Sequence, residues 1–361
     1  MDKRNAYVVI MAGGIGSRFW PLSKRALPKQ FIDFLGTGKS LIRHTYERFA
    51  KQFDPAHIYV VTNQDYASLV QEHLPEIGNE QLLIEPSAKN TAPCVALASY
   101  HIASLNPDAV LVVAPSDHLI LDEAAFHQRI EEAVGFASGN QVLCTMGIEP
   151  TRPDTGYGYI QYNTIPAEGN FHEVRLFTEK PTLEIAKTFV ESGEFLWNSG
   201  IFIWRADSII REFAQHLPDI AEHFDPLREA GSGFPAPATV EAIYGLTRSI
   251  SIDYGILEKS ANVYVLPASF GWSDLGTWKS LHEISEKNAH QTAVIGKRVM
   301  TYDSSGSLVF NHTNRLVVMR GVSNLVVVDT GDVLLIMERD SEQELRQVVA
   351  DVQGLYKDRY S

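Results

Sequence analysis

The sequence predicts an α/β fold with a mostly parallel sheet, followed by a small β-rich domain. Short apolar runs alternate with helical patterns over about the first 270 residues, which is typical of βαβ units. After "KNAHQTA", the pattern changes to short β runs separated by turns. A chain of 361 residues also exceeds the usual size of one compact unit. We therefore expect one domain over residues 1–287 and a second, with a terminal helix, over 288–361.

The first predicted domain contains strands, helices and one long loop. Two helices are predicted over 41–49 and 126–137, where apolar residues recur on one helical face, and Asp122 is placed to cap the second. A further helix is predicted over 274–287. "GSGFPAPAT", residues 231–239, is the strongest loop signal, and we interpret it as an excursion within the domain. The predicted strands are the apolar runs Tyr7–Met11, Ile58–Thr62, Gln81–Ile84, Ala109–Ala114 and Gln141–Met146.

The second predicted domain consists of the β runs "SLVFNHTN", "RLVVMRGVSN", "LVVVDTGD" and "VLLIMERD". Their spacing fits a small β-helix or a short sandwich, and periodicity does not choose between them. Ser341 and Glu344 match a capping box that would open a last helix through about Leu355. The runs carry more apolar residues than a domain of about 70 residues covers alone. We expect a homo-oligomer, most simply a homodimer, formed through this domain.

Composition limits the possible partners and the location. The formal net charge of −13 argues against binding to nucleic acid or to an anionic membrane. Cys94 and Cys144 stand in apolar settings, which favours buried free thiols over a disulfide or a zinc site. No apolar run approaches the roughly 18 residues of a membrane span, and "YVVIMA" is too short for a signal sequence. We expect a cytoplasmic protein whose phosphate ligands, if any, meet a local basic pocket.

Such a basic pocket is indicated by "GGIGSRFWPLSKRALPKQF", residues 13–31. Glycines after a strand let backbone N–H groups approach a phosphate, because no Cβ blocks the way. The cations that follow are Arg18, Lys24, Arg25 and Lys29. Lys24 and Arg25 are equally well explained as a solvated basic face.

Two similar glycine patterns nearby are weaker. A dinucleotide fingerprint would need glycine where Phe19 stands, so a nicotinamide dehydrogenase is a remote alternative. "GTGKS", residues 36–40, ends like a Walker A loop, but Asp33 occupies the place of the required glycine. We interpret it as a turn followed by a helix that Ser40 caps.

The pair "GGIGSR" and "PKQF" resembles the signature of the sugar nucleotidyltransferases, and "SRFWPLSK" with "LPKQF" resembles their mannose-1-phosphate guanylyltransferase branch. Six further segments resemble that family in the same order: "EPSAKNTAPCVA", "VAPSDHLI", "TGYGYI", "FTEKP", "WNSGIFIW" and "FGWSDLGTW". The resemblance implies a Rossmann-like nucleotidyltransferase domain with a mixed, mostly parallel sheet. It also implies a Mg²⁺-dependent reaction of GTP with mannose 1-phosphate to GDP-mannose and pyrophosphate. The isomerase domain of the bifunctional members has no counterpart here, so we expect one activity.

The phosphate groups require positive charge. Arg18, with its planar fork of donors, suits the leaving pyrophosphate, and Lys29 suits a second phosphate contact, as the resemblance also implies. Asp117 follows a predicted strand and Asp274 lies far away in sequence; together they could hold Mg²⁺. Asp274 could instead cap a helix. The backbone around the nucleotide would come from Ala12, Gly13, Gly14, Gly16 and Ser17.

A carboxylate is predicted to bind the guanine base. Glu85 ends a predicted strand and could accept both N–H donors of guanine, with Asn90 and Thr91 meeting the base and ribose. The alternative is a solvated Glu85 just before Pro86.

The sugar phosphate is assigned to another segment. Lys180 would hold the phosphate, while Glu179 accepts hydrogen bonds from sugar hydroxyls. Both can serve only if the backbone turns there, because adjacent strand residues face opposite sides. Asn198, Gly156 and Tyr157 would complete the sugar pocket, although ordinary turn formation and core packing also explain Asn198 and Tyr157.

Two other functions remain as alternatives. The same chemistry could act on another sugar phosphate or another NTP. A catalytically silent paralogue could sense GDP-mannose. The presence of the two lysines, the arginine and the two aspartates named above favours an enzyme.

Overall fold

The computed structural model describes residues 5–229 and 233–360. The chain folds into two compact units, each built from separate stretches. Unit 1 contains the described residues up to Gly13, together with 45–116 and 120–272. Unit 2 contains 14–44, 117–119 and 273 to the end of the described chain. The domain boundary at 287/288 stays a prediction.

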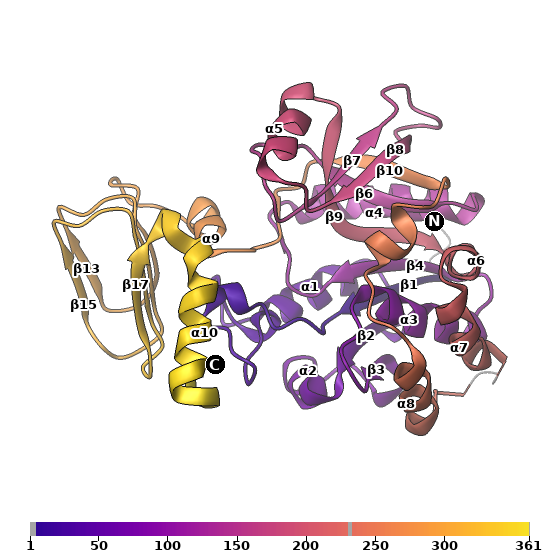
Figure 1. Cartoon of the computed structure of the whole chain (residues 1–361), viewed down its shortest axis with the longest axis horizontal. Helices are drawn as coiled ribbons and strands as arrows, with labels where there is room; N and C mark the ends of the chain where they lie inside the picture. Colours follow the sequence, from indigo (N-terminus) through magenta and orange to yellow (C-terminus); the bar gives the residue numbers. More distant parts are fainter. Residues whose placement is uncertain (1–4, 230–232, 361) are drawn as a thin grey trace. The chain divides into compact units, whose positions relative to one another are not determined.

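Unit 1 is built on a nine-stranded mixed sheet with the order β3-β2-β1-β4-β9-β6-β10-β8-β7 (Figure 1). Strands β1, β2, β3 and β4 are parallel neighbours, and β6 pairs parallel with β10. Strand β9 runs antiparallel between β4 and β6. The strands are β1 (Ala6–Met11), β2 (Ile58–Asn63), β3 (Leu82–Glu85), β4 (Val110–Pro115), β6 (Leu143–Ile148), β7 (Gly158–Tyr162), β8 (His172–Glu179), β9 (Phe195–Arg205) and β10 (Val263–Ala268). The five predicted strands are confirmed to within two residues at each end.

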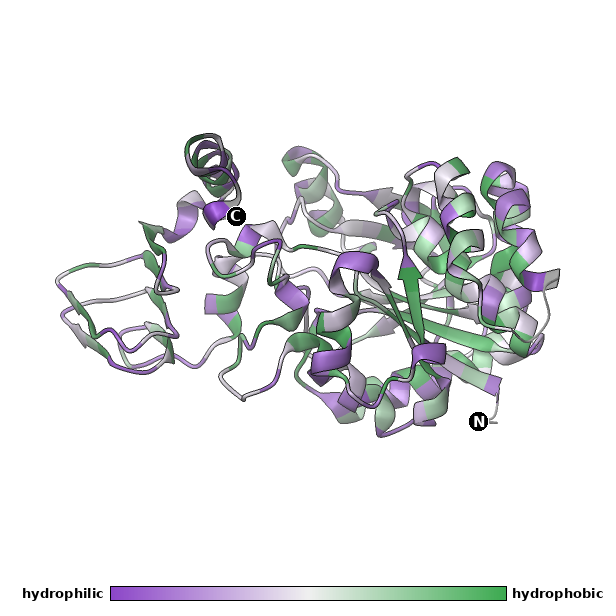
Figure 2. Ribbon diagram, turned by 90° about the horizontal axis from the view of Figure 1, so that it is seen from below, coloured by the Kyte–Doolittle hydropathy of each residue, from purple (hydrophilic) through white to green (hydrophobic). Residues whose placement is uncertain are grey.

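Helices cover this sheet because its central strands, such as β1, β2, β4 and β6, are apolar on both faces. Figure 2 shows the strands in green, with purple, hydrophilic stretches on the surrounding helices. Helices α3, α6 and α7 pack together, and α4 packs against β4, β6, β9 and β10. The helices are α1 (Leu41–Ala50), α2 (Ala67–His73), α3 (Thr91–Leu105), α4 (Glu123–Gly139), α5 (Leu183–Ser192), α6 (Ala206–His216), α7 (Pro218–Glu229) and α8 (Pro237–Leu246). The predicted cap is confirmed: the Asp122 carboxylate accepts a hydrogen bond from Ala125 N at 2.9 Å.

Parallel pairing brings the carboxyl ends of several strands to one edge of the sheet. The register places Asn63 opposite Glu85 and Met11 opposite Pro115. Gly13 and Ser116 follow at this edge, where Ser116 N donates to Met11 O at 3.0 Å. Open α/β sheets bind ligands at such an edge.

Unit 2 contains a small β-helix. Of the two folds that the sequence allowed, a β-helix and a short sandwich, the first is therefore correct. Parallel strands stack in two sheets with the orders β12-β14-β16-β17 and β13-β15, and only β17 runs antiparallel to its neighbour. The strands are β12 (Ala293–Gly296), β13 (Val299–Tyr302), β14 (Leu308–Asn311), β15 (Val317–Arg320), β16 (Leu325–Asp329) and β17 (Leu334–Glu338). Short strands β5 (Leu119–Ile120) and β11 (Trp272–Ser273) lie where the chain passes from one unit to the other.

A stack of polar residues fixes one corner of the β-helix. Asn311 and Asp329 are in register and fully buried. Asn311 Nδ2 donates to Lys297 O at 2.8 Å and to Arg315 O at 2.9 Å. Gly296 has φ 108°, and a Cβ there would lie 1.9 Å from Asn311 O, so this corner requires glycine.

The core of unit 2 joins the glycine loop to the β-helix. Phe19 packs on Phe34 and on Trp278, with ring centroids 4.5 and 4.9 Å apart. Trp278 in turn packs on Phe310 of β14 at 5.8 Å. The loop after β1 therefore rests on the same apolar core as the C-terminal strands.

Three predicted features of local structure are wrong in detail. The helix expected over 274–287 is α9 (Trp278–Ile284), because Thr277 and not Asp274 is the N-cap and accepts from Ser280 N at 3.2 Å. The capping box at Ser341 is also wrong. Ser341 lies in the 3-10 segment η8 (Arg339–Glu344), and α10 (Leu345–Tyr356) begins after Glu344.

The third error concerns the loop at 231–239. Its last three residues begin α8, with Pro237 at the first helical position, where proline is favoured. Residues 230–232 lie outside the described chain.

Both cysteines are buried free thiols, as predicted. Among the described residues, no helix combines the length and apolarity needed to cross a membrane.

Candidate active site

The glycine loop of unit 2 is held in a tight, defined turn. Gly16 adopts φ 70°, and a Cβ on it would meet the Lys29 Cβ at 2.4 Å. Lys29 N donates to Ile15 O at 3.1 Å, and Ser23 Oγ donates to the same oxygen at 2.6 Å. Only glycine fits at position 16, so this glycine is required by close approach as well as by its positive φ.

Lys29 is the buried centre of the candidate site, with 5% of its surface exposed. Its Nζ lies 2.8 Å from Asp117 Oδ2 and donates to Asp274 O at 2.5 Å. The structure thus brings together three residues that the sequence assigned to phosphate and metal. Burial raises the pKa of Asp117, but the Lys29 and His118 charges and hydrogen bonds outweigh it, so the pKa lies below its ordinary value.

The Asp274 side chain has a different position from the one a helix cap requires. Its Oδ1 accepts from Gly276 N at 2.9 Å in the turn before α9. Leu275 has φ 45° in that turn, an uncommon backbone conformation that can mark a functional site. The alternative explanation of Asp274 as a helix cap is therefore wrong.

The other cations of the loop divide into two kinds. Lys24 Nζ lies 2.5 Å from Asp332 Oδ2, so it forms an ion pair within unit 2. Arg25 is exposed, and Arg18 is half-buried. Within residues 5–229 and 233–360, the Arg18 side chain has neither a hydrogen bond nor an ion pair to the protein. Ser17 begins the 3-10 turn η2 (Ser17–Phe19) and is exposed, as is Gly14.

The segment "GTGKS", residues 36–40, which ends like a Walker A loop, is a turn, as predicted. The Asp33 carboxylate accepts backbone hydrogen bonds from Leu35 N and Thr37 N at 3.1 Å and from Gly38 N at 2.6 Å. The residue that excludes a Walker A loop is therefore the one that organises this turn. Helix α1 begins directly after Ser40.

Glu85 of unit 1 is buried, with 5% of its surface exposed, so the alternative of a solvated Glu85 is wrong. Tyr244 of α8 donates its hydroxyl hydrogen to Glu85 Oε1 at 3.0 Å. Glu85 Oε2 faces Gly13, where a Cβ would lie 3.4 Å away. Burial raises the pKa of Glu85 to about 7, although the Tyr244 hydrogen bond acts in the opposite direction.

Other residues predicted to bind the nucleotide already make structural contacts. Ala12 N donates to Val61 O at 2.8 Å, so this N–H is engaged in the sheet. Asn90 caps α3 and accepts from Thr91 N at 2.8 Å. Thr91 Oγ1 accepts from Ile252 N at 2.9 Å. Nucleotide contacts at these three positions stay predictions.

The residues of unit 1 that were predicted to bind the sugar phosphate lie near one another. Gly156 and Tyr157 also make local structural contacts. Lys180 has φ 48°, so the backbone turns after β8, as the two assigned roles require. Lys180 Nζ donates to Glu179 Oε1 at 2.5 Å. Gly156 N donates to Asp154 Oδ1 at 2.8 Å, and the buried Tyr157 ring packs on Trp197 and Trp272.

Three residues of these sites were missed by sequence reasoning. Gly158 stands opposite Glu179 in the β7–β8 register, and a Cβ there would lie 2.4 Å from Glu179 Oε2. Asp253 accepts from Asn198 Nδ2 at 3.0 Å. Tyr244 reaches Glu85 across 159 positions of sequence. The second glycine of "TGYGY" was a signal for Gly158, whereas Tyr244 and Asp253 lie in stretches without a recognisable motif.

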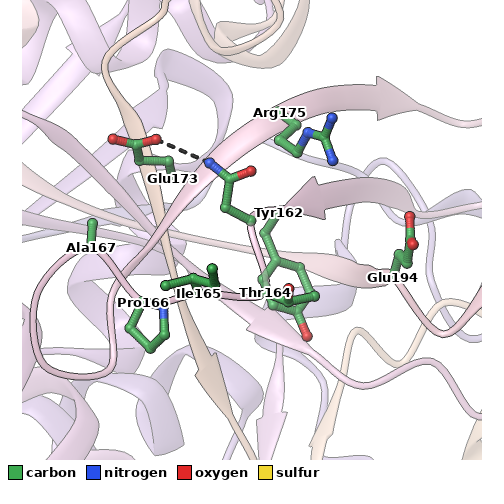
Figure 3. A pocket seen from close by; sticks show the side chains of 9 residues that line it. Tyr162, Thr164, Ile165, Pro166, Ala167, Glu173, Arg175 and Glu194 are labelled. Carbon is green, nitrogen blue, oxygen red and sulfur yellow. Dashed lines mark hydrogen bonds between the residues drawn. The ribbon is translucent and has the colours of Figure 1, made fainter.

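A separate hollow of about 410 Å³ lies on the β7–β8 hairpin (Figure 3). Its polar lining includes Glu173, Arg175 and Glu194, and Asn163 Nδ2 donates to Glu173 Oε2 at 3.0 Å. Its lining contains none of the predicted site residues. We do not assign the reaction to it.

Comparison with known proteins identifies the family. A model described as "Nucleotidyl transferase" matches residues 7–291, and one described as "MannoseP isomerase/GMP-like beta-helix domain" matches 297–352. The chain belongs to the nucleotidyl transferase family. It is thus a nucleotidyltransferase with a β-helix-like C-terminal domain, and members of this family generally use a divalent metal ion.

Two curated bacterial proteins are among those similar to this chain. "Xanthan biosynthesis protein XanB" of Xanthomonas campestris pv. campestris (strain B100) is 37% identical over 352 residues, which are 96% of this chain and 73% of that protein. "Mannose-1-phosphate guanylyltransferase" of Escherichia coli (strain K12) is 35% identical over 365 residues, covering 98% and 75%. A crystal structure described as "mannose-1-phosphate geranyltransferase" from Thermus thermophilus has a TM-score of 0.86 at 33% identity, covering 97% and 99% of the two chains.

The buried Glu85 makes stability depend on pH. Its folded pKa of about 7 exceeds the ordinary value of 4.5, so between these values the unfolded chain loses a proton that the folded chain keeps. Stability therefore falls as pH rises from about 4.5 to 7, by on the order of 3 kcal/mol from this group. We expect Glu85→Gln to remove this dependence while Gln keeps the bond from Tyr244.

The measurement is the melting temperature of both proteins at intervals from pH 4.5 to 8. The melting temperature of the variant should rise relative to that of the wild type as pH increases, and the variant should have the higher melting temperature at pH 8. Parallel curves for the two proteins would contradict a buried, proton-binding Glu85.

Proposed function

We propose that this nucleotidyltransferase transfers GMP from GTP to mannose 1-phosphate, giving GDP-mannose and pyrophosphate. The observation that carries the proposal is the Lys29 ammonium, which is buried between the Asp117 carboxylate and the Asp274 carbonyl. This cluster follows a glycine loop in a chain similar, over nearly its whole length, to a protein described as a mannose-1-phosphate guanylyltransferase. The buried free thiols Cys94 and Cys144 support action in a reducing compartment such as the cytoplasm.

The reaction requires charge neutralisation more than a protein nucleophile. A phosphate oxygen of mannose 1-phosphate attacks the α-phosphorus of GTP, a new P–O bond forms, and the bond to the β-phosphate oxygen breaks. Pyrophosphate leaves with the electron pair. Arg18, whose donors are not engaged by described protein groups, binds the leaving pyrophosphate, and Lys29 contacts a second phosphate. Backbone N–H groups of Gly14, Gly16 and Ser17 offer further donors.

The residues present fit a divalent cation, and we propose Mg²⁺. The Asp117 and Asp274 carboxylates would hold it: the Asp117 carboxylate lies 2.8 Å from the Lys29 ammonium, and the same ammonium binds the Asp274 carbonyl. Oxygen donors are the ligands that Mg²⁺ prefers. Among the described residues, His, Cys, Asp and Glu side chains form no group of three around one point, so phosphate oxygens and water would complete the shell. When bound, Mg²⁺ supplies a Lewis acid to the phosphates.

The base and sugar contacts come from unit 1. Glu85 has Oε1 engaged by Tyr244 and Oε2 beside Gly13, where no side chain intervenes. We propose that it accepts the adjacent N–H donors of guanine, with Asn90 and Thr91 beside the base and ribose. Lys180 holds the sugar phosphate, Glu179 and Asn198 bind sugar hydroxyls, and Gly156 with Tyr157 shapes the pocket wall.

One assay tests the function. Pyrophosphate release is measured with four NTPs crossed with mannose, glucose and fucose 1-phosphates, with and without Mg²⁺. Turnover should be highest with GTP and mannose 1-phosphate and should require the metal. Turnover with another pair would assign the same chemistry to other substrates, and binding of GDP-mannose without any turnover would overturn the enzymatic proposal in favour of a sensor.

Removal of either aspartate charge should abolish most turnover. We expect Asp117→Asn and Asp274→Asn each to lower kcat on the order of 10²-fold or more, because the metal loses a charged ligand. Asp65→Asn, at an exposed aspartate of the same chain, is the matched control and should keep wild-type activity. Kinetics at increasing Mg²⁺, with circular dichroism to confirm folding, make the measurement; near-normal Mg²⁺-dependent activity in either variant rules out the assignment.

The choice of guanine should depend on Glu85. Glu85→Gln keeps the shape but replaces one acceptor with a donor that faces the donors of guanine. The ratio of kcat/KM for GTP to that for ATP or UTP should fall by a factor on the order of 10 to 100. The same comparison in wild type and variant makes the test. An unchanged preference would assign base recognition to other groups.

We also propose a homodimer formed through the C-terminal strands. β17 lies at a sheet edge and exposes Leu334 (49%) and Ile336 (60%) on one face. An exposed apolar edge strand favours pairing with a second chain. Wild type should sediment as a dimer at micromolar concentration, and Ile336→Lys should shift it to monomer. Ile165→Lys, at an even more exposed isoleucine of unit 1 (81%), is the matched control and should leave the dimer intact. A monomeric wild type would contradict the proposal.

A further inference from the structure

Asn198 in β9 has an orientation that the surrounding hydrogen bonds determine. Its Oδ1 accepts from Gly200 N at 3.1 Å and lies 3.2 Å from Thr145 Oγ1, whose single hydrogen can be donated either to it or to Ile201 O. Its Nδ2 donates to Asp253 Oδ1 at 3.0 Å. The amide oxygen and one of the two N–H groups are therefore engaged by protein groups. Asn198 keeps one N–H donor for a ligand.

Asp253 opens an unusual backbone segment that holds the end of β8. It is the first residue of the π-helical turn η7 (Asp253–Leu257), a rare structure that often occurs at functional sites. Tyr254 donates its hydroxyl to Glu179 O at 3.4 Å, and Glu179 N donates to Glu258 Oε1 at 3.2 Å. The side chains of Tyr254 and Glu258, which follow Asp253 in sequence, thus form hydrogen bonds with the backbone of Glu179. The partly buried Asp253 carboxylate is fixed relative to this acid.

The charged groups around Asp253 come from several elements. Burial, and then repulsion from Glu179, raise the pKa of Asp253 to about 7, while Lys180 and the Asn198 hydrogen bond act in the opposite direction. Helix α6, which also packs against η7, is followed by the apolar Leu217 beside Gly255. Its ionisable Glu212 and His216 lie 3.2 Å from each other. Among the described residues, Lys180 is the cation that acts on the Asp253 carboxyl, and it also forms an ion pair with Glu179.

Hydrogen-bond inventory indicates which ligand suits this group. The carboxylates of Asp253 and Glu179 accept hydrogen bonds, and the spare Asn198 N–H donates one. Each hydroxyl of a sugar both donates and accepts, so a polyol can satisfy all three groups at once. A Cβ at Gly158 would lie 2.4 Å from Glu179 Oε2 and 3.3 Å from the Asn198 Cβ, so this glycine lets the Glu179 carboxylate lie close to Asn198.

We propose that Asp253 is a second acidic contact for the acceptor sugar: it fixes Asn198 and accepts, together with Glu179, hydrogen bonds from sugar hydroxyls. The inference rests on the proposed function, because it names a further specificity residue of the same sugar site. Hydroxyl donors stabilise the ionised carboxylates, so binding of mannose 1-phosphate strengthens as pH rises through about 7.

The test compares Asp253→Asn with wild type from pH 6 to 8.5. We expect KM for mannose 1-phosphate to rise by on the order of tenfold or more at pH 8, with KM for GTP unchanged. The phosphate of the substrate titrates near 6, so the measured quantity is the ratio of variant to wild-type KM at each pH. This ratio should be largest at pH 8 and should shrink below pH 7, where wild type carries the proton. Asp219→Asn, in an exposed ion pair with Arg248, is the matched control with a ratio of one throughout.

A second measurement uses wild type alone. Calorimetric titration with mannose 1-phosphate at pH 7.5, in two buffers of different ionisation enthalpy, should show release of a fraction of a proton. A pH-independent KM ratio near one, or no proton release, would overturn the role of Asp253 while GDP-mannose synthesis by wild type stands. Absence of GDP-mannose synthesis by wild type would instead overturn the proposed function, whatever the variant does.

Discussion

Three separate stretches of unit 2 meet at the ammonium group of Lys29. The loop 14–44 supplies the lysine, 117–119 supplies the Asp117 carboxylate, and the C-terminal stretch supplies the Asp274 carbonyl. A buried ammonium costs several kcal/mol unless it is paired and hydrogen-bonded. The positions of all three stretches are therefore constrained together. Gly16 belongs to the same constraint, because any side chain there would displace Lys29.

The apolar core of unit 2 packs against the glycine loop and so helps to hold Lys29 in place. Phe19, next to Arg18, packs on Trp278 of α9, and Trp278 packs on Phe310 of the β-helix. Trp278 Nε1 donates to Trp20 O at 3.2 Å, and Trp20 Nε1 donates to Tyr360 O at 2.7 Å near the end of the chain. The β-helix is thus part of the scaffold that positions the glycine loop.

The parts of the fold that the sequence predicted well are those determined locally. Apolar runs indicated the strands, and Asp122 marked the start of α4, because both signals involve near neighbours in sequence. The start of α9 was predicted wrongly because Asp274 and Thr277 are both good caps, and only the tertiary position of the turn selects Thr277. β-helix and sandwich have similar strand periods, so only the pairing of distant strands distinguishes them.

The same distinction applies to the sites. The family resemblance assigned Lys29, Asp117 and Asp274, and the structure brings them together. It gave no indication of Tyr244 or Asp253, whose partners lie 159 and 55 positions away in sequence. A side chain that acts by orienting another one needs only the right place in space. It leaves no pattern in the local sequence.

The acids of the candidate sites differ in the direction of their pKa, and this difference follows from their partners. Asp117 is beside an ammonium, which holds its pKa below the ordinary value despite burial. Glu85 has a neutral tyrosine as its partner and Asp253 a neutral amide with a second acid nearby, so burial raises both pKa values to about 7. An acid that is ionised without a ligand is suited to a cation. An acid that holds a proton until a ligand arrives is suited to neutral donors such as base N–H groups and sugar hydroxyls, because those donors replace the proton without bringing a charge. In a chain of net charge −13, the proposed sites would use the cations of the glycine loop for phosphate and carboxylates for the base and the sugar.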